Sequence, residues 1–159
     1  MGKFSFDGMI EKLKADPRSI VFTEGHDARI QEAASRLLKE GLLKVILVGA
    51  PDEVKASSEK NGFDVSGATI IDPAHYEGMD EMVAKMVELR KGKMTEEECR
   101  AALSKSNYFG TMLVKMGVAD CLLGGATYST ADTVRPALQL IKTKPGAHLV
   151  SSCFILVRD

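Results

Sequence analysis

The sequence has no excess of charge of either sign and no long apolar run. Its 159 residues include 21 Lys and Arg against 22 Asp and Glu, a formal net charge of −1, so the composition does not indicate nucleic acid as a partner. No apolar segment is long enough to span a membrane, and the N-terminal segment is amphipathic rather than a signal peptide. We therefore expect a cytoplasmic protein that binds neither nucleic acid nor membrane.

Cysteine is also scarce. Cys99, Cys121 and Cys153 are odd in number and far apart, which is typical of free thiols rather than of a disulfide framework. Cys121 and Cys153 lie in apolar runs, where we expect them to be small buried hydrophobic residues. The sequence has no Cys-x-x-Cys and no pair of histidines at metal-ligand spacing, so we expect no metal site.

Three common catalytic motifs are missing as well. The sequence contains no Gly-x-x-x-x-Gly-Lys-Ser/Thr, no Gly-x-Gly-x-x-Gly after a strand and no Gly-x-Ser-x-Gly. The first two cradle nucleotide phosphates, and the third presents a nucleophilic serine. These absences argue against an ordinary NTPase, a dinucleotide-binding enzyme and a hydrolase with a nucleophile elbow.

Short apolar runs alternate with segments of helical period along the chain. Hydrophobic residues make up 45% and charged residues 27% of the sequence, a balance typical of one globular domain at this length. Continuous apolar strands favour a parallel sheet covered by helices on both faces, which is an α/β fold. The predicted strands are 19–23, 44–48, 68–71, 121–123 and 149–157, and the predicted helices are 4–15, 28–40, 53–60, 78–90, 107–116, one that begins at 95 and one that follows the strand 121–123.

The segment 120–146 carries the strongest indication of function. Its apolar run is followed by Gly124 and Gly125, which allow a sharp turn or a close approach of the backbone to another group. Hydroxyl side chains and a helix start come next. The first N–H groups of a helix are unpaired and lie at the positive end of its dipole, so this order is typical of an anion site. Arg135 adds a planar cation suited to phosphate or carboxylate.

The start of this helix is ambiguous in the sequence. Ser129, with an acidic residue three positions later, fits a capping box, but Pro136 favours a later start because proline is tolerated within the first turn. We favour Thr133 as the N-cap, which places Arg135 in the first turn and leaves Ser129 and Thr130 free to face a ligand. In the alternative, the hydroxyls only cap the helix and Arg135 pairs with a carboxylate.

A polar loop also follows the first predicted strand, and loops at the carboxyl ends of parallel strands form ligand sites. Glu24, Asp27 and Arg29 in this loop could orient a ligand or one another, or simply cap the next helix. His26 is the one histidine that we would test as a proton carrier. Arg90 follows a different helix, where it either complements the helix dipole or clamps a phosphate.

Long blocks of the sequence resemble the phosphate acetyltransferase family. The blocks are Asn107-Tyr-Phe-Gly-Thr-Met-Leu-Val-Lys-Met-Gly-x-Ala-Asp120 and Gly125-Ala-x-x-Ser-Thr-Ala-Asp-Thr-Val-Arg-Pro-Ala-Leu-Gln-x-Ile-Lys-Thr-Lys-Pro-Gly146, with a shorter match over 20–29. Thr23 stands where that family usually has proline, and Tyr128 stands where many members have histidine.

The resemblance implies a doubly wound, Rossmann-like, mostly parallel sheet with helices on both faces, in the isopropylmalate dehydrogenase-like superfamily. Members of the family are considerably longer and place their active site between two α/β domains. We therefore expect residues 1–147 to form the first domain and residues 148–159 to be the entry strand of a second domain that is missing. The family's catalytic Ser-Arg pair and its proposed base come from that second half, so we expect this chain alone to lack a complete active site.

The resemblance also implies an enzyme that transfers an acetyl group between coenzyme A and inorganic phosphate, in acetate metabolism. Its partners would be phosphate, acetyl phosphate and coenzyme A, with acetyl-CoA as a substrate and no tightly bound cofactor. Arg135 would be the catalytic residue that binds the phosphoryl group, Ser129 and Thr130 would hydrogen-bond the same anion, Gly125 would approach it, and Arg90 would meet coenzyme A. Two alternatives stay open, a phosphate butyryltransferase and a non-catalytic domain that senses acyl-CoA or another anion.

We also expect a homodimer or a higher oligomer. The apolar run 149–157 would be exposed in an isolated chain, and an unpaired strand edge readily pairs with a second chain. Static light scattering should therefore give a mass above the 17.2 kDa of the monomer. A mass that stays at the monomer value as the protein concentration rises would contradict this expectation.

Overall fold

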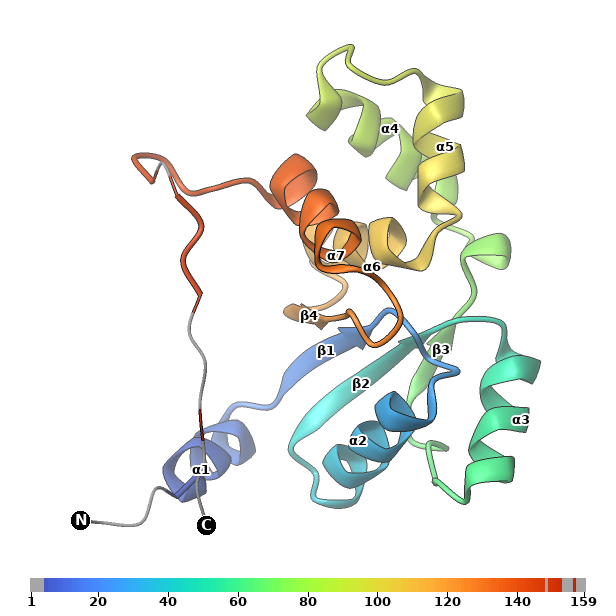
Figure 1. Cartoon of the computed structure of the whole chain (residues 1–159), viewed down its shortest axis with the longest axis vertical. Coiled ribbons are helices and arrows are strands. Elements are labelled where there is room, and N and C mark those ends of the chain that lie inside the picture. The colour runs from blue at the N-terminus through green and yellow to red at the C-terminus, as the bar shows by residue number, and fades with distance from the viewer. Residues whose placement is uncertain (1–4, 148, 153–155, 157–159) are drawn as a thin grey trace.

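The structure is a computed structural model, and it describes residues 5–147, 149–152 and 156. Its centre is a parallel sheet in the order β3-β2-β1-β4 (Figure 1), built from β1 (Arg18–Phe22), β2 (Leu43–Val48), β3 (Thr69–Ile71) and β4 (Cys121–Leu123). The strand order reverses between β1 and β4. The carboxyl ends of these two strands therefore border the crevice in which α/β proteins bind ligands.

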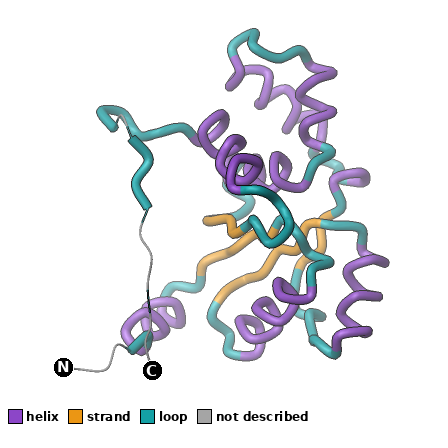
Figure 2. The backbone as a smooth tube through the Cα atoms, in the orientation of Figure 1, coloured by secondary structure: helices purple, strands orange, loops and turns teal. Residues whose placement is uncertain are grey.

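Helices cover both faces of this sheet (Figures 1 and 2), which confirms the predicted doubly wound α/β fold. One face carries α2 and α3, and the other carries α6 and α7, with α4 and α5 packed as a pair beyond α6. The more specific superfamily assignment stays a prediction. The helical elements are α1 (Asp7–Ala15), α2 (Ala28–Lys39), α3 (Pro51–Asn61), η1 (Pro73–His75), α4 (Met79–Arg90), α5 (Glu96–Leu103), α6 (Ser106–Lys115), α7 (Thr130–Pro136) and η2 (Ala137–Ile141).

Alternate residues of β1 supply the two hydrophobic cores. Val21 faces α6, where it belongs to a cluster with Phe109 and Leu113. Phe22 faces α2, in a second cluster with Ala34. All five side chains are at most 1% exposed, as expected for a central strand whose successive side chains point to opposite faces of a covered sheet.

Local sequence signals set several element ends where they were predicted. Thr95 and Glu98 form the capping box at the start of α5, with Glu98 N 3.2 Å from Thr95 Oγ1 and Thr95 N 2.8 Å from Glu98 Oε2. Asp27 caps α2 by accepting a hydrogen bond from Arg29 N. Gly62 ends α3 with a φ of 72°, a left-handed conformation that costs glycine little.

Two expectations about the C-terminal part of the sheet have different outcomes. Cys121 was expected to be buried but is exposed, because β4 is the edge strand of the described sheet and Leu123 beside it is also 53% exposed. Within the predicted strand 149–157, residues 149–152 and 156 adopt no strand, and Cys153 lies outside the described residues. The proposed domain boundary at residue 147 stays a prediction. None of the helices that the structure describes is long and apolar enough to cross a membrane.

Replacing Gly110 with Ala should destabilise the protein, because α6 lies so close to the sheet that a Cβ at this position would be 2.8 Å from Thr23 Cγ2. Overpacking of this kind costs about 1–3 kcal/mol. The matched control is Gly8→Ala in α1, where nothing lies within 4 Å of the added Cβ and the better helix propensity of alanine should leave stability unchanged or slightly higher. Urea denaturation of both variants measures the difference, and equal effects would contradict the close packing.

Candidate functional site

The loop after β4 forms an anion-binding cradle, and the anion that it holds is the protein's own Glu24. We call the backbone N–H groups of Gly125, Thr127 and Tyr128 the amide cradle. These three groups donate to Glu24 Oε1 over 3.1, 3.0 and 3.3 Å. Backbone N–H groups that converge in this way make an anion-binding concavity. The sequence predicted that this segment binds a ligand anion, whereas the structure shows its loop N–H groups bound to a carboxylate of the same chain. Binding of a ligand anion here stays a prediction.

The second carboxylate oxygen of Glu24 is bonded as well. Thr23 Oγ1 donates to Glu24 Oε2 over 2.7 Å, and the two side chains are only 2% and 1% exposed. Burial alone raises the pKa of Glu24, but the hydrogen bonds from Thr127, Thr23, Tyr128 and Gly125 outweigh it, so the pKa lies below its ordinary value. Glu24 is therefore a carboxylate in the folded protein at neutral pH.

Gly124 is required for this arrangement because of the space that Thr23 occupies. A Cβ at position 124 would lie 2.5 Å from Thr23 Oγ1 and 3.7 Å from Glu24 Oε2. Any other residue would therefore push the Thr23 hydroxyl away from the carboxylate that it serves. Gly125 next to it has a φ of 103°, which turns its N–H toward Glu24 at little conformational cost.

A second link joins the same two loops. Arg29 holds Asp27 through two hydrogen bonds, 3.0 Å from Nε to Oδ1 and 2.8 Å from Nη2 to Oδ2, and its Nη2 also donates to the carbonyl oxygen of Ala126 over 2.6 Å. Glu24, Asp27 and Arg29 therefore orient one another and the loop after β4. This is one of the alternatives that the sequence left open. The loops that follow β1 and β4 are thus joined by hydrogen bonds.

The helix after this loop starts earlier than predicted. Ser129 is the N-cap of α7, with its Oγ accepting from Asp132 N over 3.1 Å and donating to Asp132 Oδ2 over 2.6 Å. Thr133, the expected N-cap, lies inside the helix and donates to the carbonyl oxygen of Ser129. Arg135 consequently stands in the last turn of α7 rather than the first, and the hydroxyl of Ser129 is engaged in capping. Thr130 begins the helix and is exposed.

Pro136 is tolerated at the end of α7 because another residue replaces the hydrogen bond that it cannot make. A proline has no N–H to donate to the carbonyl four residues earlier, which here belongs to Asp132. The side chain of Asn107, at the start of α6, donates to that carbonyl from Nδ2 over 2.8 Å. Asn107 is 7% exposed. The chain then continues as the π-helical turn η2.

Arg135 lines a cleft between α5, the start of α6 and α7, which we call the α5–α7 cleft. Its volume is about 790 Å³, and Lys105, Tyr108 and Tyr128 also line it. The Tyr128 hydroxyl lies 3.1 Å from Ser106 Oγ, which fixes the ring at the rim nearest the amide cradle. The cleft is thus assembled from both sequence blocks that carried the family resemblance.

The α5–α7 cleft is lined by two cations, Arg135 and Lys105, and by two carboxylates, Asp132 and Glu98. Arg135 is 58% exposed, and its Nη1 is 3.8 Å from Asp132 Oδ1, which is too far for a strong pair. The two carboxylates in the lining take part in helix caps, Asp132 with Ser129 and Glu98 with the N–H of Thr95. Apart from that ion pair, the described contacts include no hydrogen bond from the side chain of Arg135 or Lys105, so both cations are available to an anionic ligand.

The other predicted site residues do not all reach this cleft. Arg90 lies at the end of α4 and is not among the described residues that line it. Its buried Nε has no hydrogen-bond partner within the described part of the chain. Gly125 belongs to the amide cradle, and Ser129 and Thr130 stand at the start of α7. The roles of these four residues in ligand binding therefore stay predictions.

Lys105, Asn107 and Tyr108 were not identified as site residues from the sequence. Pro136 alone indicates that the carbonyl of Asp132 needs a donor, but no local pattern shows that Asn107 supplies it from 25 residues away. The described residues contain no group of three or more His, Cys, Asp or Glu that could hold a metal ion. His26 contributes its backbone carbonyl to Ser57 Oγ, and its role as a proton carrier stays untested.

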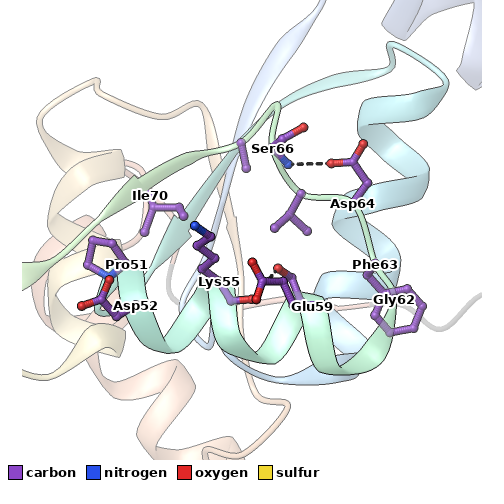
Figure 3. A pocket seen from close by; sticks show the side chains of 12 residues that line it. Pro51, Asp52, Lys55, Glu59, Gly62, Phe63, Asp64, Ser66 and Ile70 are labelled. Atoms are coloured by element: carbon purple, nitrogen blue, oxygen red, sulfur yellow. Dashed lines mark hydrogen bonds between the residues drawn. The ribbon is translucent and has the colours of Figure 1, made fainter.

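A different cavity, of about 610 Å³, lies between α3 and β3 (Figure 3). The side chain of Lys55 extends across it, while Asp52 and Glu59 stand along the same helix. Asp64 at its far end accepts a hydrogen bond from the N–H of Ser66 over 2.9 Å. Three carboxylates against one ammonium group do not favour an anion, so the predicted phosphate site is better matched by the α5–α7 cleft.

The fold and the cleft define an α/β protein whose anion-directed groups gather beside the switch point of a parallel sheet. A sequence model of the family described as phosphate acetyl/butaryl transferase matches residues 5–159. The chain belongs to this family, which confirms the resemblance drawn from its sequence blocks.

Relatives of known name agree with this assignment. The chain is 49% identical to the phosphate acetyltransferase of Bacillus subtilis over 153 residues, which cover 96% of this chain and 47% of that protein. It is 52% identical to a phosphotransacetylase from Streptococcus pyogenes of solved structure, with a TM-score of 0.84 over 89% of this chain and 43% of that one. A phosphotransacetylase from Staphylococcus aureus gives 44% and 0.85, with coverage of 91% and 44%. The chain thus spans about half the length of the relatives that it matches.

Replacing Asn107 with Ala should destabilise the protein, because it leaves the carbonyl of Asp132 without a donor in a part-buried site. Losing a buried hydrogen-bond partner costs about 1–3 kcal/mol. The matched control is Asn61→Ala, which removes a similar side-chain bond to the carbonyl of Ser57 on an exposed helix end and should have a smaller effect. Thermal unfolding followed by circular dichroism compares the two, and the replacement role of Asn107 is wrong if they unfold at the same temperature.

Proposed function

We propose that this chain supplies the first-domain part of a phosphate acetyltransferase, which transfers an acetyl group between coenzyme A and inorganic phosphate. In this proposal residues 1–147 are the first domain and residues 148–159 lead into a second. Family membership and the names of the relatives support the reaction. The observation that supports a site in this chain is the α5–α7 cleft, where Arg135 and Lys105 stand beside Tyr128.

Arg135 has the main chemical role in this proposal. When the thiolate of coenzyme A attacks acetyl phosphate, a carbon–sulfur bond forms, the carbon–oxygen bond to phosphate breaks, and negative charge builds on the carbonyl oxygen and on the departing phosphate. A guanidinium group held in place beforehand stabilises that charge and lowers the barrier. Lys105 adds a second cation at the same cleft, while Ser129 and Thr130 would contact the anion from the start of α7. Gly125 would support the site only indirectly, because its N–H is bound to Glu24.

No covalent acyl-enzyme is required for this transfer, and the described cysteines do not suggest one. Burial raises the pKa of Cys99, although the nearby Arg90 acts in the opposite direction. Cys121 is exposed as a residue, but partial desolvation of its thiol and the carboxylate of Asp120 raise its pKa as well. A thiol with a raised pKa is a poor nucleophile at neutral pH. Acetyl transfer would therefore be direct, with coenzyme A entering as a substrate. We also propose that Arg90, which lies outside the α5–α7 cleft, meets coenzyme A from the end of α4.

We also propose a cytoplasmic location and a dimer or higher oligomer.

The family description covers acetyl and butyryl transfer alike. The relatives compared above are named phosphate acetyltransferase or phosphotransacetylase, and both names specify the acetyl group. We therefore assign acetyl rather than butyryl as the transferred group.

The proposal predicts that coenzyme A-dependent turnover of acetyl phosphate is absent from this chain alone and strong in a longer form that also carries the second domain. The second domain supplies the groups that complete the site. Release of phosphate coupled to formation of acetyl-CoA measures the activity. Turnover by the short chain would show that it has a complete site, and inactivity of both forms would favour a sensing domain.

Within the longer form, Arg135→Ala should lower turnover or raise the KM for phosphate by at least about tenfold, equivalent to ~1.4 kcal/mol of transition-state stabilisation. Arg36→Ala is the matched control, because Arg36 lies on α2, pairs with Glu32 and is 74% exposed. It should leave both constants unchanged. An effect of Arg135→Ala no larger than that of the control would remove Arg135 from the mechanism.

A further inference from the structure

Glu24 is the one buried side chain with a formal charge among the described residues. It is 1% exposed, whereas the other buried polar side chains, Gln31 and Asn107 among them, are neutral. Burying a carboxylate is costly unless its oxygen atoms are hydrogen-bonded. A charge in this position therefore calls for a reason beyond packing, since an apolar residue would fill the same space without that cost.

The bonds made by Glu24 explain what the charge does. Both of its oxygens are occupied, Oε1 by the amide cradle and by Thr127 Oγ1 at 3.5 Å, and Oε2 by the hydroxyl of Thr23. No cation forms a hydrogen bond to it among the described contacts. The charge is balanced mainly by N–H dipoles, and a charged acceptor makes each of these bonds stronger than a neutral one would.

The amide cradle lies immediately before the residues that build the α5–α7 cleft. Tyr128 belongs to both, because its N–H is bound by Glu24 and its ring lines the cleft. Ser129, the next residue, is the N-cap of α7, which carries Arg135. The Tyr128 hydroxyl also contacts Ser106 at the start of α6. The position of the cleft residues on α7 is thus set from one side by Glu24.

We propose that Glu24 is a positioning residue whose carboxylate takes the place of a ligand anion in the amide cradle and thereby holds Tyr128 and Arg135 where the cleft can receive phosphate. This inference rests on the proposed function for the identity of the anion. Because Glu24 fills the amide cradle, the substrate phosphate binds in the α5–α7 cleft and not against the N–H groups of Gly125, Thr127 and Tyr128. Glu24 acts through these groups and does not touch the substrate.

The test uses this chain and inorganic phosphate as the probe. Glu24→Ala should raise the dissociation constant of phosphate at least about fivefold, because displacement of a ligand-binding group by a fraction of an ångström weakens binding strongly. Glu32→Gln is the matched control, since Glu32 is an exposed carboxylate on α2 paired with Arg36, and it should bind phosphate as the unaltered chain does. Glu24→Gln, which keeps the shape of the side chain, replaces Glu24→Ala if that variant does not fold.

A double-mutant cycle separates positioning from a general loss of stability. If Glu24 acts through Arg135, removing Glu24 in the Arg135→Ala background should change phosphate affinity less than twofold, so the two losses will not add. Formate at high concentration should restore at least half of the affinity lost in Glu24→Ala by entering the emptied cradle, and chloride at the same ionic strength should not. Additive losses, or no rescue by formate, would overturn the proposal.

Two further outcomes distinguish this inference from the proposed function. Tighter phosphate binding by Glu24→Ala would show that the amide cradle is itself the phosphate site and that Glu24 competes for it, which would also overturn the proposal.

If the unaltered chain binds no phosphate at all, the proposed phosphate site fails. Nuclear magnetic resonance of this chain still tests the positioning role of Glu24 in that case. The amide signals of Gly125, Thr127 and Tyr128 should move upfield in Glu24→Ala together with loss of contacts between the Tyr128 ring and α6, and unchanged contacts would overturn positioning by Glu24.

Discussion

The structure depends on the carboxylate of Glu24 and the backbone N–H groups that surround it. Glu24 lies two residues after the end of β1, and its partners follow β4, so one buried side chain joins the carboxyl ends of the two strands between which the sheet reverses its order. A buried charge is stable only while every acceptor site is supplied. The loop after β4 therefore has little freedom to adopt another conformation while Glu24 is ionised.

This constraint places protein groups where ligands commonly bind in such folds, at the crevice of the switch point. The N–H groups of the loop after β4 are bound to Glu24, and the carbonyl of Ala126 accepts a hydrogen bond from Arg29. The α5–α7 cleft lies next to this loop and is lined by Arg135 and Lys105.

Much of the fold could be predicted from the sequence because its signals are local. The apolar runs of β1 and β2, the capping box at Thr95 and the glycine at the end of α3 each act within a few residues. The error at α7 has the opposite origin. Pro136 favours a later helix start because it removes a hydrogen bond from its own helix. Asn107, from another helix, supplies a hydrogen bond to the same carbonyl, so the helix can begin at Ser129 without leaving that carbonyl unpaired.

The sequence by itself determined most of the order of strands and helices and the family, and it indicated that the loop after β4 is suited to an oxyanion. Only the tertiary structure decided that this oxyanion is Glu24, that Arg135 ends its helix rather than beginning it, and that Lys105 stands beside it. The physical reason is that capping, helical period and glycine turns depend on neighbours in the chain. The bond between Glu24 and the N–H of Gly125, 101 residues away in the sequence, instead depends on how the sheet brings β1 and β4 together.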